Sequence, residues 1–297
     1  VLDCAVLVVS GTAGVQGHTA TLWQLLRRYQ VPAVVFVNKM DIGTADHDAL
    51  LQSLRWELDE RCIDFSQPQS QLQEELSLCD DALLDEYLAS GRVSDAQIAS
   101  AVSHRKVFPC FFGSALKREG VDALLDALGR FVQAPAYGKD FGARVYKIAR
   151  DEKGARLTFL KVTGGTLGVK QLLAGEDWQE KADQLRLYSG SKFTLLQQAP
   201  AGTVCAVTGL TKTMPGDVLG HETAAQAPAL QPVLEYRLLL TDGTDAAQAY
   251  GQLRVLEEED PALHLVWNAL LREIRVQLMG PVQMEILQKL IAQRFGL

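Results

Sequence analysis

The first 138 residues alternate apolar runs with amphipathic stretches, and this alternation constrains the fold more than any other feature of the sequence. Three nearly continuous apolar runs predict strands at residues 5–10, 33–38 and 107–112. Strands that are apolar on both faces are typical of a parallel sheet that helices cover on both sides. Between the first two runs, residues 22–29 carry apolar side chains at helical spacing. We therefore expect a doubly wound α/β sheet.

A long insertion, residues 43–106, separates the second and third predicted strands, and its leucines follow mostly helical spacing. After the third strand, residues 121–132 place their apolar side chains on one stripe and predict another helix. The sequence thus predicts a first domain over residues 1–138.

The chain changes character after this point. Residues 139–222 contain short β-rich runs punctuated by glycine, which indicates a small all-β barrel, and residues 223–231 are expected to form a linker. Residues 232–297 follow a β-α-β-β-α order, the split βαβ or ferredoxin-like pattern without its last strand. The elements expected in this α+β segment are a strand at 233–240, a helix at 245–258, strands at 263–268 and 273–278, and a helix at 282–295.

The composition excludes several classes of protein. Hydrophobic residues make up 47% of the chain and charged residues 22%, with a net charge of −7, which excludes a disordered or coiled-coil chain. No apolar run approaches the ~18–20 residues of a membrane helix, and the apolar start lacks the basic region of a signal peptide. Only the barrel segment is weakly basic, so composition alone indicates no nucleic-acid partner.

The five cysteines and five histidines are scattered along the chain, and none has the spacing of a metal site. We therefore expect no bound metal. Free, mostly buried thiols are typical of a protein kept in a reducing, cytoplasmic environment.

The second predicted strand ends in Asn38-Lys39-Met40-Asp41, at the carboxyl end where α/β sheets place ligand-binding groups. Guanine presents two adjacent donors, and one ionised carboxylate such as Asp41 can accept both. Asn38 can donate its amide to the purine N7 atom, and the aliphatic stem of Lys39 can lie along the base. A polar turn after a strand is the alternative, because Asn and Asp favour turns.

The third predicted strand ends in Gly113-Ser114-Ala115-Leu116 and lies beside the second in a doubly wound sheet. Small residues let backbone N–H groups approach the guanine carbonyl oxygen, and the Ser114 hydroxyl can brace the turn. The two motifs together favour guanine recognition over a polar turn.

The chain contains neither the GxxxxGK[ST] loop that holds phosphates in P-loop proteins nor a DxxG motif. The predicted site therefore covers the base-recognition half of a nucleotide site, with no catalytic residue and no ligand for Mg²⁺.

Through these motifs, the sequence resembles translational GTPases of the elongation factor G class. It most resembles the tetracycline-resistance ribosomal protection proteins. The opening segment VLDCAVLVVSGTAGVQGHT, the two base-recognition motifs, the barrel segment ARVYKIARDEKGARLTFLKVTGGTLG and the later segment IRVQLMGPVQMEILQKLI carry the likeness. The resemblance implies guanine-binding roles for the following residues: Asn38, Lys39, Asp41, Ser114, Ala115 and Leu116.

The resemblance also implies a larger machine of which this chain is an internal fragment. The P-loop, the switch regions and the catalytic His belong upstream in the family, so we expect the chain alone to hydrolyse no GTP. In the intact protein the resemblance implies GTP or GDP with Mg²⁺, and a ribosome partner through its RNA and proteins. The alternatives are a general elongation factor G and a non-catalytic module that docks on the ribosome, RNA or protein.

Three features of the predicted surface concern contacts with other molecules or domains. The first is a cluster of barrel residues that forms either a basic face toward RNA or an ordinary solvated face: Arg144, Lys147, Arg150, Lys153, Arg156 and Lys161. The second is the acidic run at 257–260, which is either solvated or in contact with another domain or a ribosomal protein. The third is the pair of truncated sheet edges, in the first and last segments, through which the chain is expected to self-associate.

Overall fold

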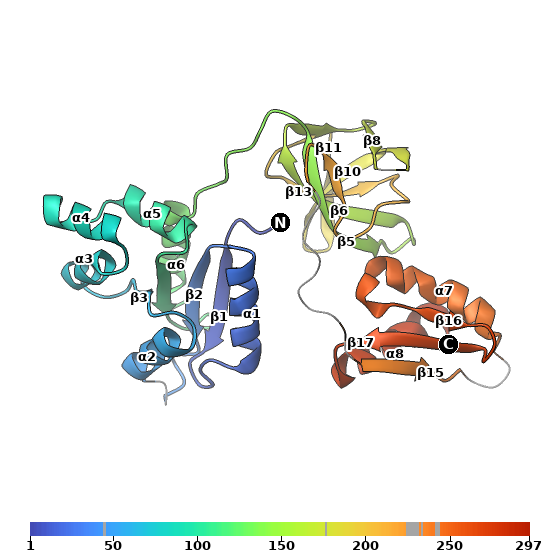
Figure 1. Ribbon diagram of the computed structural model, residues 1–297, viewed down its shortest axis with the longest axis horizontal. Helices are drawn as coiled ribbons and strands as arrows, with labels where there is room; N and C mark the ends of the chain where they lie inside the picture. Colours follow the sequence, from blue (N-terminus) through green and yellow to red (C-terminus); the bar gives the residue numbers. More distant parts are fainter. Residues whose placement is uncertain (44–45, 176, 224–231, 233, 241–243) are drawn as a thin grey trace. The chain divides into compact units, whose positions relative to one another are not determined.

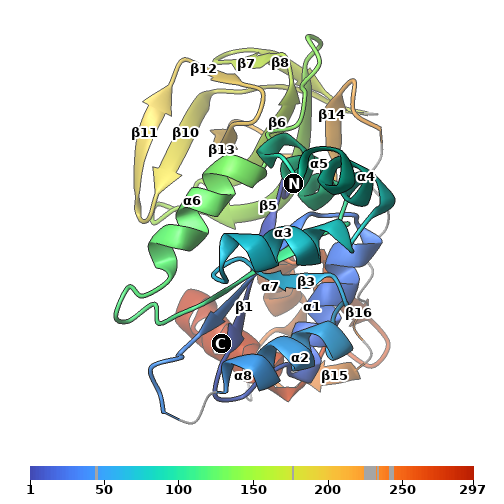
Figure 2. The ribbon, with the colours of Figure 1, turned by 90° about the vertical axis from the view of Figure 1, so that its left-hand side faces the viewer.

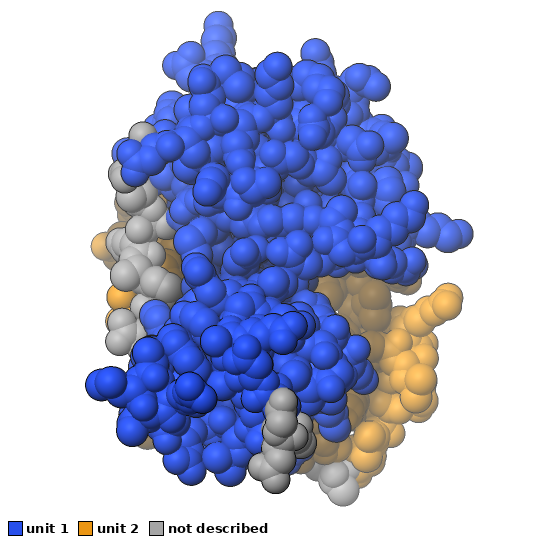
Figure 3. Space-filling model, turned by 90° about the vertical axis from the view of Figure 1, so that its right-hand side faces the viewer, with its two compact units in different colours: residues 1, 136–297 blue, residues 2–135 orange. Residues whose placement is uncertain are grey.

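The computed structural model describes residues 1–43, 46–175, 177–223, 232, 234–240 and 244–297. The chain divides into two compact units, coloured separately in Figure 3. One comprises residues 2–135, and the other comprises Val1 with residues 136–297. Each unit is described by itself.

The first unit is built on a four-stranded parallel sheet in the order β1-β2-β4-β3 (Figure 1). The three predicted strands are present as β1 (Ala5–Ser10), β2 (Ala33–Asn38) and β4 (Phe108–Phe112). The fourth, β3 (Cys62–Asp64), lies inside the insertion that was expected to be helical. Its three residues pair with β4 and extend the sheet.

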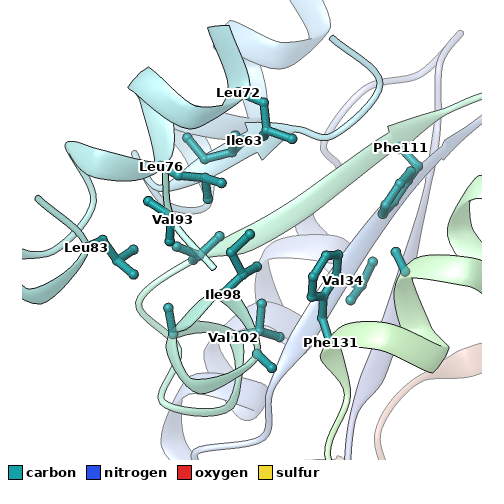
Figure 4. Close-up of a cluster of buried hydrophobic side chains, with 14 of the residues drawn as sticks. Val34, Ile63, Leu72, Leu76, Leu83, Val93, Ile98, Val102, Phe111 and Phe131 are labelled. Atoms are coloured by element: carbon teal, nitrogen blue, oxygen red, sulfur yellow. The ribbon is translucent and has the colours of Figure 1, made fainter. Parts of the chain in front are cut away.

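Helices cover both faces of this sheet. Because β2 is apolar on both sides, each of its faces is buried in an apolar cluster. Val34 and Phe36 face a cluster that the insertion helices complete (Figure 4), and Val35 and Val37 face a second cluster. The helices of the unit are α1 (Gly17–Arg28), α2 (His47–Glu57), α3 (Gln69–Ser77), α4 (Asp81–Ser90), α5 (Asp95–Ser103) and α6 (Val121–Phe131).

The buried stripe of α1 differs from the predicted one. Trp23 is the buried residue of α1, and it packs edge-on against Phe108, with ring centroids 4.7 Å apart. Leu22 and Tyr29, which the helical spacing placed on the buried stripe, are exposed. Trp56 of α2 has 91% of its surface exposed.

The second unit begins with an antiparallel β structure (Figures 1 and 2). A six-stranded sheet in the order β11-β10-β13-β6-β5-β14 and two two-stranded sheets contribute to one apolar cluster. The strands are β5 (Gly142–Arg150), β6 (Arg156–Gly164), β7 (Thr166–Gly168), β8 (Leu172–Ala174), β9 (Gln179–Lys181), β10 (Gln184–Ser189), β11 (Lys192–Leu196), β12 (Gln198–Pro200), β13 (Val204–Thr208) and β14 (Val218–Gly220).

The last segment has a separate core between two helices and a three-stranded antiparallel sheet in the order β15-β17-β16. The predicted strand at 263–268 instead begins as a short 3₁₀ helix. The strand predicted from 233 starts outside the described residues, as does most of the predicted linker 223–231. The elements are β15 (Leu234–Leu238), α7 (Ala246–Glu259), η1 (Pro261–Leu263), β16 (Val266–Asn268), β17 (Glu273–Leu278) and α8 (Pro281–Phe295).

The acidic run is engaged within the chain. Glu258 forms ion pairs with Arg150 and Arg156 of the β-structure, at 3.1 and 3.4 Å. Glu259 pairs with Arg294 at 2.8 Å, and Asp260 accepts from the N–H of Ala262. The alternative in which this run contacts another part of the chain therefore describes it better than a solvated face.

The predicted basic cluster is partly consumed by internal contacts. Arg144 pairs with Glu222 at 2.6 Å, Lys161 is buried, and the Nζ atom of Lys147 lies 5.7 Å from the ring centre of Phe159. Together with the pairs that Glu258 makes, these contacts leave no single free basic face built from all six side chains.

Among the described residues, no helix is long and apolar enough to cross a membrane, and no three His, Cys, Asp or Glu side chains gather as they would around a metal. All five cysteines are free thiols, three of them buried.

Candidate functional site

The two predicted motifs meet at the carboxyl edge of the parallel sheet. Val37 and Phe112 are register partners near the ends of β2 and β4, and the motif residues follow directly. The N–H of Gly113 donates to the Val37 carbonyl at 2.9 Å, and the N–H of Met40 donates back to the Gly113 carbonyl at 3.0 Å. These bonds extend the pairing of the two strands into the two loops.

Asn38 connects the loops through its side chain. Its Oδ1 atom accepts from the N–H of Lys39 at 2.8 Å and from the N–H of Ala115 at 2.9 Å. Since the oxygen is occupied by these bonds, the amide NH₂ is the group that can donate to a purine N7. Asn38 therefore connects the two loops, and its amide NH₂ is the group for which the sequence predicts a contact with a purine.

Asp41 is held by two partners from the second loop. The Ser114 hydroxyl donates to its carboxylate, and the Nζ atom of Lys117 lies 3.7 Å from Oδ2. The Ser114 hydrogen bond first, and then the Asp41 backbone N–H and the charge of Lys117, lower the pKa of Asp41 below its ordinary value. The carboxylate is thus ionised at neutral pH, as acceptance of two guanine donors requires.

Ser114 lies in a tight turn at the end of β4. Its side chain is buried, with 1% of the residue exposed, and its backbone exchanges two hydrogen bonds of 3.0 Å with Glu119. A Cβ atom at Gly113 would lie 2.0 Å from the Glu119 carbonyl oxygen. Glycine is therefore required at 113, because the turn brings the Glu119 carbonyl into the space that any Cβ atom would occupy.

The remaining predicted residues lie at the same edge but are more open. Lys39 adopts a left-handed backbone conformation, with φ of +67°, which is uncommon for a residue with a side chain and is often found at functional sites. Ala115 is exposed, and Leu116 has 90% of its surface exposed. The structure thus brings all six predicted residues together, with Asn38, Asp41, Ser114 and Ala115 directly linked.

Lys117 is the residue that sequence reasoning missed. It lies three positions after Ser114, and its N–H donates to the Ser114 hydroxyl oxygen at 3.3 Å. The signal that could have found it is a basic side chain in the turn that follows a predicted base-recognition motif.

A comparison of the chain with known protein families indicates the class of its first unit. Residues 1–134 match the family described as the elongation factor Tu GTP binding domain. The matched region contains the parallel sheet and both loops of the site, so the first unit is similar to a guanine-nucleotide-binding domain.

Similarity to particular proteins extends over the whole chain. The oxytetracycline resistance protein of Streptomyces rimosus is 30% identical, with 100% of this chain and 51% of that protein covered. The tetracycline resistance protein TetP of Clostridium perfringens is 24% identical over 100% of this chain and 50% of its own length. Elongation factor G of Mycoplasma pneumoniae is 26% identical over 99% of this chain and 54% of its own length.

These matches show that the chain is similar to elongation factor G and to tetracycline resistance proteins. The chain spans about half the length of the curated relatives it matches. A crystal structure of a protein from Thermus thermophilus has the same fold, with a TM-score of 0.82 and 23% identity, over 96% of this chain and 51% of that one.

Proposed function

We propose that residues 38–41 and 113–116 bind the base of a guanine nucleotide. The observation that carries this proposal is the Asn38 side chain, whose oxygen joins the two loops while its amide remains available to a purine. Asp41 accepts the N1–H and the exocyclic amino group of guanine, one on each oxygen. Lys39 and Leu116 flank the base, and Ala115, whose N–H donates to Oδ1 of Asn38, keeps the second loop beside it.

This arrangement distinguishes guanine from other purines by hydrogen bonding. Adenine offers no pair of donors at the corresponding edge, so it would desolvate the two acceptor sites of Asp41 that face the purine and leave them unpaired. A polar group left in that state costs about 1–3 kcal/mol, and a charged group costs more. We therefore expect binding in the order guanine, hypoxanthine, adenine, because hypoxanthine retains the ring N–H and lacks the amino group.

The test is a titration of the whole chain with guanosine, inosine and adenosine 5′-monophosphates, followed by NMR at the amides of Lys39 and Ala115. Asp41→Ala should abolish the preference for guanosine monophosphate. Asp95→Asn, which removes an exposed carboxylate paired with Arg130 elsewhere in the same unit, is the matched control. Equal binding of the three nucleotides by the unmodified chain would refute the proposal.

For the intact protein we propose a GTP-dependent ribosome-binding translation factor, with tetracycline resistance as its role and general elongation as the alternative. The support is the similarity to proteins of both names over the whole chain. Mg²⁺ and the phosphates would then be held by residues other than 38–41 and 113–116. The chain by itself should show no GTP hydrolysis above the rate of the buffer, and a measurable turnover would contradict this.

We also propose three domains with boundaries at 1–138, 139–222 and 232–297: a P-loop GTPase-type half domain, a translation-factor barrel and a ferredoxin-like domain. The separate apolar clusters of the barrel and of the last segment support this division. Expression of 139–222 alone should give a folded β protein with dispersed amide signals.

One observation favours a docking module as a second function. Four aromatic rings run in sequence across β5, β6, β10 and β11, with neighbouring ring centres 5.3–6.3 Å apart. Lys147 and Arg186 lie over two of these rings. Proteins that bind single-stranded nucleic acid use aromatic side chains on which the bases stack, together with neighbouring cationic side chains. The rings are those of Tyr146, Phe159, Tyr188 and Phe193.

Co-sedimentation with ribosomes at rising salt tests the docking function. Retention without nucleotide that falls with salt, and falls further in Phe193→Ala, would support it. Leu172→Ala, which removes another exposed apolar side chain of the barrel, is the control. No retention at low salt would count against a docking function for this chain.

Self-association through sheet edges remains a proposal. Among the described strands, β1 and β15 each have one unpaired edge, and such edges can pair with another chain. Sedimentation velocity over a range of concentrations should show a dimer, and a monomer at all concentrations would exclude it.

A further inference from the structure

Lys117 reaches the base-reading carboxylate by two routes. Its Nζ atom lies 3.7 Å from Oδ2 of Asp41. Its backbone N–H donates to Oγ of Ser114 at 3.3 Å, and the Ser114 hydroxyl in turn donates to Asp41. One route acts through charge, and the other acts through the orientation of a buried hydroxyl.

The carboxylate has room for both of these partners and for a base. An ionised carboxylate offers about four lone-pair sites, two on each oxygen. Guanine needs one site on each oxygen, the Ser114 hydroxyl and the Asp41 backbone N–H take the other two, and the Lys117 ammonium at 3.7 Å acts through its charge. Lys117 and the base therefore do not compete for the same site.

We propose that Lys117 is a positioning residue for guanine recognition, which holds the Asp41 carboxylate turned so that both oxygens can face the purine edge. This inference rests on the proposed function of residues 38–41 and 113–116. It adds a specificity-determining side chain outside the two motifs.

The size of the effect follows from exposure. The Lys117 side chain is 53% exposed while that of Asp41 is 15% exposed, so water and salt screen the pair from the lysine side. Exposed ion pairs of this kind change an equilibrium about two- to fivefold. The groups that face Asp41 are the Ser114 hydroxyl, the Lys117 ammonium and its own backbone N–H.

The experiment compares Lys117→Met, which keeps the aliphatic stem, with Lys117→Arg, which keeps the charge. Lys106→Met is the matched control, because it removes an ion pair of 2.7 Å with Asp80 elsewhere in the unit. Each full-length variant is titrated with guanosine and adenosine 5′-monophosphates, and the Ala115 amide reports binding. A second titration follows the carboxyl carbon of Asp41 against pH without nucleotide.

The expected result is weaker binding of guanosine monophosphate by Lys117→Met, by about two- to fivefold at low salt, with no change for adenosine monophosphate. Lys117→Arg should restore the affinity, and Lys106→Met should leave it unchanged. Without nucleotide, the Asp41 carboxyl in Lys117→Met should take up its proton at a higher pH than in the unmodified chain.

Each other outcome has a distinct meaning. If the unmodified chain prefers guanosine monophosphate and Lys117→Met binds it equally well or more tightly, Lys117 is not a positioning residue, and the proposed function stands. If the unmodified chain shows no preference, the proposed function fails and the inference fails with it. An Asp41 titration that is identical in both chains would also overturn the inference.

Discussion

The backbone N–H of Ala115 donates to the side-chain oxygen of Asn38 at 2.9 Å, although the two residues are 77 positions apart in the chain. Asn38 ends one strand, and Ala115 follows the end of its neighbour in the sheet. The same oxygen accepts from Lys39. One side chain therefore sets the spacing of the two loops that are proposed to hold the base.

Asn38→Ala should open the two loops. Each net hydrogen bond is worth about 0.5–1.5 kcal/mol, so the loss of both bonds should destabilise the first unit by roughly 1–3 kcal/mol. Urea unfolding followed by the fluorescence of buried Trp23 would measure this change. A variant as stable as the parent chain would show that Asn38 does not brace the loops.

Asp41→Asn should transfer the preference from guanine to xanthine. The asparagine side chain offers one acceptor and one donor, which matches the N–H and carbonyl edge of xanthine. The measurement is the ratio of affinities for xanthosine and guanosine 5′-monophosphates by NMR. A ratio unchanged from that of the parent chain would argue against a contact between Asp41 and the base.

Gly113→Ala should disrupt the turn that carries Ser114. The added Cβ would lie 2.0 Å from the backbone oxygen of Glu119, and backbone cannot move as a flexible side chain does. The expected cost is about 2–4 kcal/mol, in the range of severe single substitutions. Gly129→Ala, in α6 with no atom within 4 Å of the added Cβ, should instead stabilise by about 0.5–1 kcal/mol.

Glu258→Gln should weaken the attachment of α7 to the barrel. Arg156 is only 11% exposed and donates to Thr158, Leu210 and Thr213, so the barrel orients its guanidinium for Glu258. Without the charge of Glu258, the barrel and the last segment should tumble more independently in NMR relaxation. The variant Glu258→Asp, which retains the charge, should change less, and identical relaxation in all three proteins would contradict the pairing.

Thiol chemistry should be slow at Cys79 and Cys205. Burial raises the pKa of each thiol to about 11, so only about one molecule in a thousand is a thiolate at pH 8. Because the folded pKa lies above the unfolded one, the associated stability is present below pH ~9 and is lost as the pH rises toward 11. Iodoacetamide labelling with mass spectrometry should find Cys4 modified before these two residues.

Sequence reasoning found the elements whose signal is local. The runs at β2 and β4 are long and apolar on both faces, and the motifs that end them needed only the rule that ligands bind at the carboxyl ends of strands. The three-residue strand β3 was missed, because so short a run cannot be distinguished from helix in an insertion rich in leucine.

The exposure of Leu22 and Tyr29, the contact of Lys117 and the identity of the Glu258 partners were missed for a different reason. Helical spacing favoured Leu22 and Tyr29, but the space beside Phe108 and Arg105 accommodates the larger Trp23 ring. The partners of Glu258 are 102 and 108 residues away, and no pattern in one sequence specifies which carboxylate a distant arginine meets. Such pairings are fixed by the assembled fold.

The insertion leaves the sheet after Asn38-Lys39-Met40-Asp41, adds β3 to the far side of β4, and returns to β4 and the second loop. A base held by both loops would link the two ends of the insertion that contains α2 to α5. By mass action, any opening of the structure that separates these two ends would then require release of the nucleotide. Amide hydrogen exchange in helices that never touch the nucleotide should therefore slow as guanosine monophosphate saturates the site.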